Sequence, residues 1–145
     1  MNAAQRAMER LVRWTELEYG APGCGTGTAL RAGGREIVHF HSDRDADLYL
    51  TDGPIRRLRP ELDHSTALRL HPDSPWVTVH LDCVGDADLL VSLASVALKV
   101  NAAAGPESGS RAGTVCNLAR VDVLSRRHLA EASAHVHLPG QRRTA

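Results

Sequence analysis

Alternating apolar and polar residues mark two pairs of segments in the middle of the chain. Residues 36–41 (EIVHFH) and 46–51 (ADLYLT) alternate on either side of SDRD. Residues 66–70 and 76–82 do the same on either side of HPDSP. A period of two is typical of half-buried strands, and Ser, Asp and Pro favour turns. The pattern therefore predicts two β-hairpins.

Helical periodicity separates and flanks these hairpins. The middle segment opens with a Gly-Pro pair, and Pro is favoured at the first turn of a helix. The last segment is apolar on most sides, so we expect other elements, namely the sheet, to cover it. The expected helices are residues 2–18, with Asn2 as the cap, residues 53–62, with Pro54 at the first position, and a segment from Asp86 or Asp88 to about Asn101.

The order of elements, α-β-β-α-β-β-α, predicts an α+β fold with a four-stranded antiparallel sheet covered by helices on one face. The Gly-rich segment at 20–27 (GAPGCGTG) lacks the lysine of a phosphate loop, so we interpret it as a connection. The domain should comprise residues 1–101. Residues 102–113 are small, polar and rich in Gly and Pro, which predicts a linker. Residues 114–145 would form a C-terminal extension, partly disordered.

Composition narrows the functional classes. The 145 residues carry 17 basic and 17 acidic side chains, so the formal net charge is zero. No basic stripe is interleaved with aromatic residues, and we therefore expect no nucleic-acid partner. The longest apolar run is too short to span a bilayer, and no signal-peptide pattern is present. We expect a cytoplasmic protein that does not bind membranes, and the oligomeric state stays open.

Side-chain parity predicts where the polar residues of the hairpins gather. Successive side chains of a strand point to opposite faces of the sheet. The aliphatic residues should share the face that packs on the helices, which leaves one polar face. Its expected members are His39, His41, Asp47, Tyr49, Thr51, Arg69, Thr78 and His80.

Three readings of this polar face remain open. It can be a solvated or merely hydrogen-bonded sheet surface, a ligand-binding or catalytic surface, or a metal site. The presence of three histidines and no lysine is unusual for a strand surface in water. For metal, His39 and His41 project to one side, and Asp47 or His80 could complete a ligand set. We predict no cofactor, and a divalent metal at His39 and His41 is the lesser alternative.

Acid–base chemistry is the other candidate. Histidine titrates near neutral pH, and Asp43 or Asp47 could orient it. Tyr49 could donate a hydrogen bond to a developing oxyanion. For nucleophilic catalysis, the sequence identifies no base beside Cys24. The other two cysteines, Cys83 and Cys116, are interpreted as packing thiols.

Several of these segments resemble those of a known family. GREIVHFHSDRDADLYLT, SPWVTVHLD and DADLLVSLASVALK are similar to those of the small bacterial luciferase-domain proteins, and the resemblance extends over about residues 7–100. Its most specific residues are Glu36, His39, His41 and the pair Asp47–Leu48, and Trp76 stands where the last strand begins. The domain is also similar to that of the fungal luciferases, which oxidise a polyphenolic pyrone with dioxygen and without a known metal or flavin.

The resemblance and the polar face together suggest a small-molecule site. The protein would be a cofactor-independent oxygenase acting on an enolisable aromatic substrate. The catalytic candidates are His39 or His41 as the base, Asp47 as its orienting partner and Tyr49 as a hydrogen-bond donor. The substrate-binding candidates are His64, Arg69, Thr78, His80 and Trp76. The alternative is a non-catalytic binding or interaction module, which a flat and fully hydrated polar face would favour.

Overall fold

The computed structural model describes residues 1–104, 116 and 117, and in this part of the chain six strands form one antiparallel sheet. The strand order is β1-β2-β3-β4-β6-β5. The strands are β1 (Glu18–Gly20), β2 (Thr28–Ala32), β3 (Arg35–Phe40), β4 (Asp45–Tyr49), β5 (Leu68–Leu70) and β6 (Trp76–His80). The two predicted hairpins are therefore present as β3–β4 and β5–β6, with β4 paired to β6 in the centre.

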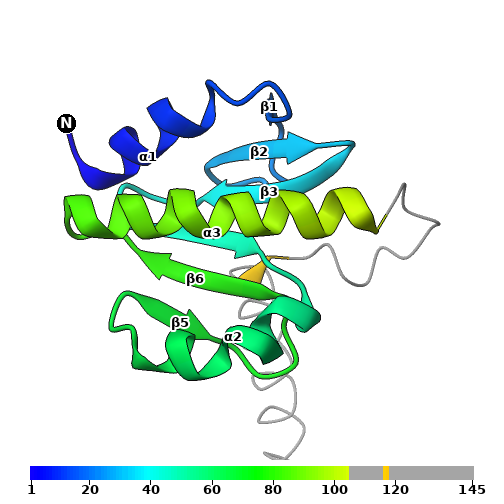
Figure 1. The fold of residues 1–145 in the computed structure, drawn as a ribbon. Helices are drawn as coiled ribbons and strands as arrows, with labels where there is room; N and C mark the ends of the chain where they lie inside the picture. Colours follow the sequence, from blue (N-terminus) through cyan, green and yellow to red (C-terminus); the bar gives the residue numbers. More distant parts are fainter. Residues whose placement is uncertain (105–115, 118–145) are drawn as a thin grey trace, which may run out of the picture.

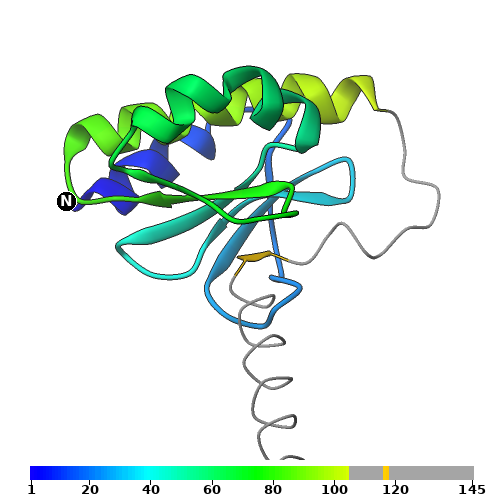
Figure 2. The same cartoon turned by 90° about the horizontal axis from the view of Figure 1, so that it is seen from below.

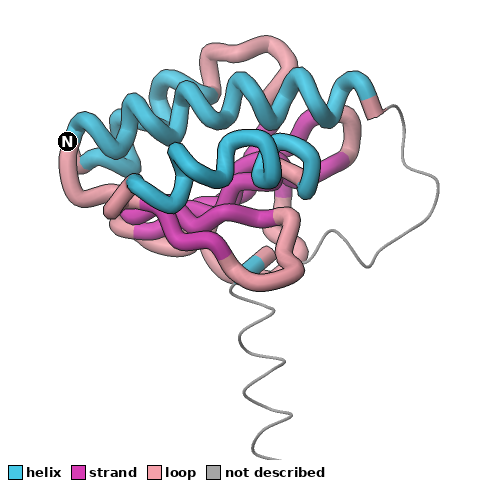
Figure 3. The backbone as a smooth tube through the Cα atoms, turned by 60° about the horizontal axis from the view of Figure 1, so that its bottom comes forward, coloured by secondary structure: helices cyan, strands magenta, loops and turns pink. Residues whose placement is uncertain are grey.

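The helices of the described residues lie on one face of this sheet, as Figures 1, 2 and 3 show. They are α1 (Ala3–Leu11), α2 (Asp52–His64) and α3 (Val84–Ala103). Residues 116 and 117 lie on the opposite face (Figure 2). The α+β class and the one-sided helical layer are confirmed. None of the described helices is both long enough and apolar enough to cross a membrane.

The predicted count of four strands is wrong, because β1 and β2 extend the sheet beyond β3. Ala32 pairs with Arg35 across a two-residue turn at Gly33 and Gly34, where φ is +57° and +84°. A two-residue turn of this kind requires positive φ at both positions, which glycine adopts without steric cost. The Gly-Gly pair is thus the sequence signal for the missed β2–β3 hairpin.

Several helix boundaries also differ from the prediction. The middle helix begins at Asp52, so Pro54 is its third residue and not its first, and the last helix begins at Val84 rather than at Asp86 or Asp88. The first helix ends at Leu11 rather than near residue 18, and tight turns over Trp14 and Leu17 lead into β1. Its cap is as predicted, because the Asn2 side chain accepts a hydrogen bond from the Gln5 backbone amide and the Gln5 side chain accepts one from the Asn2 backbone amide. The last helix runs to Ala103, so it includes the first residues of the predicted linker.

The buried core lies between the sheet and the helices. Val38, Leu48 and Val77 are neighbours across β3, β4 and β6, and all three are fully buried. On the helical side, Leu90 and Ala94 of α3 are also fully buried. These residues confirm that the aliphatic positions of the hairpins share the helix-covered face. The predicted linker and extension otherwise fall in residues 105–115 and 118–145, outside the described residues.

The first turn of α3 gives a stability prediction. The carboxylate of Asp86 accepts hydrogen bonds from the backbone amides of Asp82 and Cys83, at 2.9 and 3.0 Å. Asp86→Asn should lower the free energy of unfolding by about 1 kcal/mol, because capping bonds and the helix dipole favour a carboxylate there. Urea unfolding at pH 7 measures the loss, and Asp82→Asn is the matched control, expected to change little.

The same cap should make stability depend on pH. Burial alone would raise the pKa of Asp86, but the two backbone amides outweigh it and hold the pKa below its ordinary value. The stabilisation is therefore fully present above the ordinary pKa of an aspartate and is lost as the pH falls through the lower, folded-state value. Asp86→Asn should remove this part of the acid sensitivity.

Candidate functional site

One row of polar side chains crosses the helix-free face of the sheet. His39 of β3 is directly opposite Asp47 of β4, Asp47 is opposite Thr78 of β6, and Thr78 is opposite Arg69 of β5. These residues alternate with the core residues described above, so the predicted parity is confirmed. The row brings residues from four strands together at the spacing of cross-strand neighbours.

Asp47 is the centre of a hydrogen-bonded network. Its Oδ1 accepts a bond from the Thr78 hydroxyl at 2.6 Å, and its Oδ2 accepts bonds from His41 Nε2 at 3.0 Å and from the Asn117 backbone amide at 2.8 Å. Burial alone would raise the pKa of Asp47, but the hydrogen bonds from His41 and Thr78 outweigh it and hold the pKa below its ordinary value. Asp47 is therefore a buried carboxylate that stays ionised and fixes its partners.

The network sets the orientation of His41. Because Nε2 donates to Asp47, the ring of a neutral His41 carries its lone pair on Nδ1. That Nδ1 atom is buried and has no hydrogen-bond partner among the described residues. A buried nitrogen lone pair without a partner is costly, and such an atom calls for an explanation.

His39 is more enclosed than a base that meets substrate would be. Its side chain has no exposed surface, and its Nε2 lies 2.5 Å from the backbone carbonyl of Thr26. Burial is the main cause of a lowered pKa at His39 and outweighs the hydrogen bond to the Thr26 carbonyl. Its ring lies beside that of His41, with 4.1 Å between the ring centroids. His39 is thus a neutral, inward-facing imidazole.

The Gly-rich loop at residues 20–27 lies against these two rings. Glu36, a buried residue of β3, accepts a hydrogen bond from the Gly23 backbone amide at 2.5 Å. That contact places Cys24 beside His39, with Sγ 3.4 Å from Nε2 and 3.8 Å from Nδ1. The loop is a connection, as predicted, but it also supplies a thiol to the polar face.

The short described segment near the C-terminus reaches the same place. Asn117 is buried, and its side chain contacts the Ser74 hydroxyl and donates to the Trp76 carbonyl at 3.0 Å. Cys116, its neighbour, is also buried. Because the Asn117 amide also donates to Asp47, this segment is tied to the centre of the network. The interpretation of Cys116 as an ordinary packing thiol is therefore incomplete.

Four potential ligand atoms converge at this point. One atom each from Cys24, His39, His41 and Cys116 lie within 4.8 Å of one another. The two cysteines are not joined by a disulfide bond. The third cysteine, Cys83, is exposed at the start of α3, which corrects its interpretation as a packing thiol. Two thiols and two imidazoles form a donor set that can hold a transition metal.

Next to this cluster the polar face carries a shallow, open pocket. The pocket has a volume of about 200 Å³. Five of the predicted site residues line it, together with three that were not chosen from the sequence. The lining residues are His41, Asp45, Asp47, Arg69, His71, Thr78, His80 and Asn117. A second cavity, of about 580 Å³, lies beside α1 and includes Met8, Glu9, Phe40 and His41.

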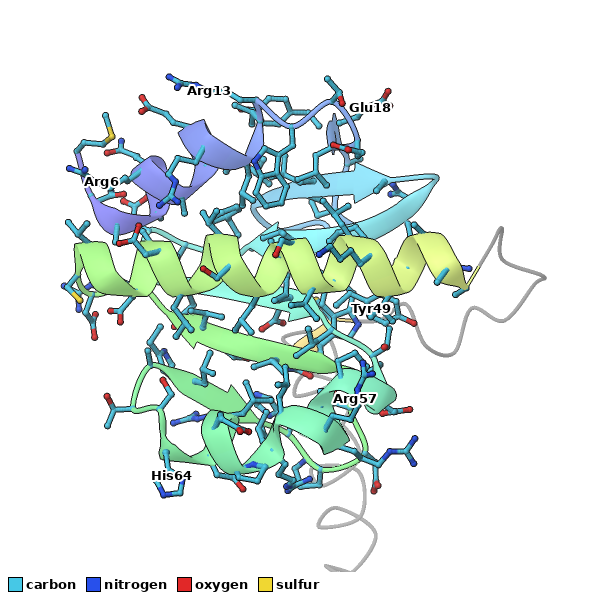
Figure 4. All side chains as sticks on the ribbon, in the orientation of Figure 1. Arg6, Arg13, Glu18, Tyr49, Arg57 and His64 are labelled. Carbon is cyan, nitrogen blue, oxygen red and sulfur yellow. The ribbon has the colours of Figure 1, made fainter. Side chains whose placement is uncertain are left out.

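Four predicted site residues are absent from the lining of the 200 Å³ pocket. His39 lies in the metal-ligand cluster described above. Tyr49 packs against Trp76, with ring centroids 5.0 Å apart, and Trp76 is almost completely buried. His64 lies at the exposed end of α2, where its Nδ1 contacts the Pro60 carbonyl. Figure 4 shows Tyr49 and His64 at well-separated places. The structure therefore does not bring Tyr49, Trp76 and His64 together with His41.

His71 is the clearest pocket residue that the sequence interpretation left out. Its Nε2 lies 3.1 Å from the Thr78 hydroxyl, which donates to Asp47. Desolvation by burial is the main cause that lowers the pKa of His71, so the ring is neutral at pH 7. The alternation of side chains along the strand could have identified His71, because it comes two residues after Arg69 and therefore points to the same face.

The fold and the site define an α+β domain with an antiparallel sheet whose open face carries a buried His–Asp–Thr network. The family model of the Luciferase domain matches residues 34–97, from the β2–β3 turn into α3. This match confirms the resemblance to luciferase-domain proteins over residues 34–97. No curated protein and no solved structure matches the chain.

Proposed function

We propose that the 200 Å³ pocket on the polar face binds a small hydroxylated aromatic or pyrone and starts its oxidation by dioxygen. The observation that supports this most is convergence: His41, Asp47, Arg69, Thr78 and His80 meet at one concavity. Ligand sites are concave and have a few converging polar groups, whereas a solvated sheet face has neither feature. The volume is below the 300–1,000 Å³ typical of drug-sized ligands, so the ligand has a single ring.

Charge and protonation in the pocket suit an acidic hydroxyl group. Arg69 supplies a permanent positive charge. His80 and Asp45 form a hydrogen-bonded pair at 2.6 Å, so these two side chains satisfy each other at this edge of the pocket. His71 is neutral at pH 7 and, because its Nε2–H points to Thr78, it presents Nδ1 as an acceptor. A hydroxyl bound between His71 and Arg69 would lose its proton readily.

The first chemical step is a proton transfer. The O–H bond of the ligand breaks, the proton goes to His71 Nδ1, and the electron pair stays on the ligand oxygen next to Arg69. The resulting enolate or phenolate is electron-rich enough to be oxidised by dioxygen, which is the oxidant. We assign the base to His71 in place of His39 or His41, because His39 has no exposed surface and His41 Nδ1 is buried. Thr78 and Asp47 hold His71 in position.

Binding assays separate this site from the larger cavity. We expect Arg69→Gln and His71→Asn each to weaken binding of a hydroxylated pyrone or phenol by about tenfold, the effect of one lost hydrogen bond to the ligand. Glu9→Gln, in the 580 Å³ cavity, is the matched control and should bind normally. Isothermal titration of a panel of single-ring probes measures these affinities. If Glu9→Gln weakens binding and the other two variants do not, the assignment of the pocket is wrong.

Turnover then tests the reaction. In an oxygen-electrode assay with a bound probe, His71→Asn should lower kcat by about 10²–10⁴-fold, as expected for the loss of a general base. Activity of the unmodified protein should rise with pH only up to the lowered pKa of His71 and be flat at neutral pH. Tight binding with no oxygen uptake by any variant would favour the second candidate, a non-catalytic binding module. Oxygen uptake is the observation that separates the two candidates, because a shallow, open pocket suits both.

A further inference from the structure

We infer that Cys24, His39, His41 and Cys116 form a tetrahedral zinc site that fastens the C-terminal segment to the open face of the sheet. The four ligand atoms lie within 4.8 Å of one another and come from three separate parts of the chain. These parts are the Gly-rich loop, β3 with the residue that follows it, and the segment at residues 116 and 117. The inference does not depend on what the neighbouring pocket binds.

The spacing fits zinc. With Zn–S distances of about 2.3 Å and Zn–N distances of about 2.0–2.1 Å, adjacent ligand atoms of a tetrahedral site are about 3.3–3.8 Å apart. Cys24 Sγ and His39 Nδ1 are already 3.8 Å apart. Because no two of the four atoms are more than 4.8 Å apart, side-chain movements of only about 1 Å would close them around the ion.

The second coordination sphere is already in place. Metal-bound histidines almost always donate their other ring N–H to a carboxylate or a backbone carbonyl. His41 donates from Nε2 to Asp47, and His39 Nε2 lies 2.5 Å from the Thr26 carbonyl. His41 therefore has Nδ1 left as its ligand atom, and a His39 that donates from Nε2 to Thr26 would also bind through Nδ1, which lies 3.8 Å from Cys24 Sγ. An ion at that centre would satisfy the buried Nδ1 of His41, which has no hydrogen-bond partner among the described residues.

Charge and donor type favour the same ion. Two thiolates and two neutral imidazoles bring a charge of −2, which Zn²⁺ neutralises, so the ion and its four ligands are together uncharged. A set of two sulfurs and two nitrogens in tetrahedral arrangement is typical of structural zinc. Such a closed site leaves no position for substrate. The zinc would hold Asn117 in the wall of the 200 Å³ pocket and take no part in proton transfer.

Metal analysis of the full chain tests the site. Protein purified under reducing conditions should contain one zinc per chain. Cys24→Ser and Cys116→Ser should each weaken zinc binding by about 100-fold or more, since loss of a second-sphere partner alone costs 10–100-fold. Cys83→Ser is the matched control, because this exposed cysteine lies outside the cluster. It should retain one zinc with unchanged affinity.

Cobalt substitution identifies the ligands without relying on variant stability. The Co²⁺-loaded unmodified protein should show the intense visible bands of a tetrahedral ion and a thiolate-to-cobalt charge-transfer band. Cys83→Ser should give the same spectrum, and thiol titration of the unfolded zinc-free chain should find all three cysteines reduced. Sub-stoichiometric zinc in the reduced unmodified protein would overturn the inference. The inference would also fail if Cys24→Ser and Cys116→Ser bound zinc as tightly as Cys83→Ser. It would fail equally if the thiol titration showed a disulfide bond between Cys24 and Cys116.

Discussion

Asp47→Ala should lower the free energy of unfolding by about 3–5 kcal/mol. The substitution leaves three buried donors without their acceptor: the His41 ring N–H, the Thr78 hydroxyl and the Asn117 backbone amide. Each unsatisfied buried donor costs about 1–3 kcal/mol, and the sum is reduced because neighbours relax together. Urea unfolding followed by circular dichroism measures the loss.

The matched control is Asp43→Ala, in the turn between β3 and β4. Asp43 is exposed, so its loss should change the free energy of unfolding by no more than about 0.5 kcal/mol. The free energy of unfolding of Asp47→Asn should lie between those of the two alanine variants. The amide keeps one acceptor oxygen, but its NH₂ group is a donor where the network needs an acceptor. Equal stabilities of Asp47→Ala and Asp43→Ala would show that the network adds nothing to the folded state.

The importance of Asp47 could be predicted from sequence because it depends on local geometry. Alternation within a strand places Asp47 on the face opposite Leu48, and pairing of two hairpins brings it beside Thr78. The identity of its partners was only partly predictable. His41 belongs to the same hairpin, whereas the Asn117 amide comes from a segment 70 residues away. No short-range pattern encodes that contact.

The same limit explains why the cysteines were misread. Cys24 and Cys116 are widely spaced, and metal sites are recognised in sequence by ligands at short fixed intervals. Here the ligands come together only because Glu36 holds the Gly-rich loop against β3 and Asn117 docks on β4 and β6. These are tertiary contacts, so the spacing of the cysteines carries no signal of them.

His71 was overlooked for a different reason. It stands in the turn-rich segment HPDSP, which was interpreted as a connection between β5 and β6. Parity continues one step beyond the last paired residue of β5, so the side chain still faces the pocket. Residues that flank a strand keep its alternation for a position or two. Extending the polar face past the predicted ends of the strands would have included His71.

Gly27 shows how closely the Gly-rich loop approaches the sheet. Its φ is +84°, and a Cβ atom there would lie 1.9 Å from the backbone carbonyl oxygen of Phe40 and 3.1 Å from the Cα of His41. Gly27→Ala should therefore lower the free energy of unfolding by about 3 kcal/mol or more. A left-handed backbone costs about 1–2 kcal/mol for a residue with a side chain, and the clash with backbone atoms adds to it.

Gly25→Ala is the control that isolates the clash. Gly25 has nearly the same backbone angle, with φ +78°, but a Cβ atom there would meet nothing within 4 Å. Gly25→Ala should therefore lower the free energy of unfolding by only about 1–2 kcal/mol, which is the cost of the left-handed backbone without a clash. Gly27→Ala should also weaken zinc binding, because the loop that carries Cys24 must move away from His41, while Gly25→Ala should leave the ligands in place. Equal losses in the two variants, measured by urea unfolding and zinc titration, would show that contact between this loop and β3 does not position the site.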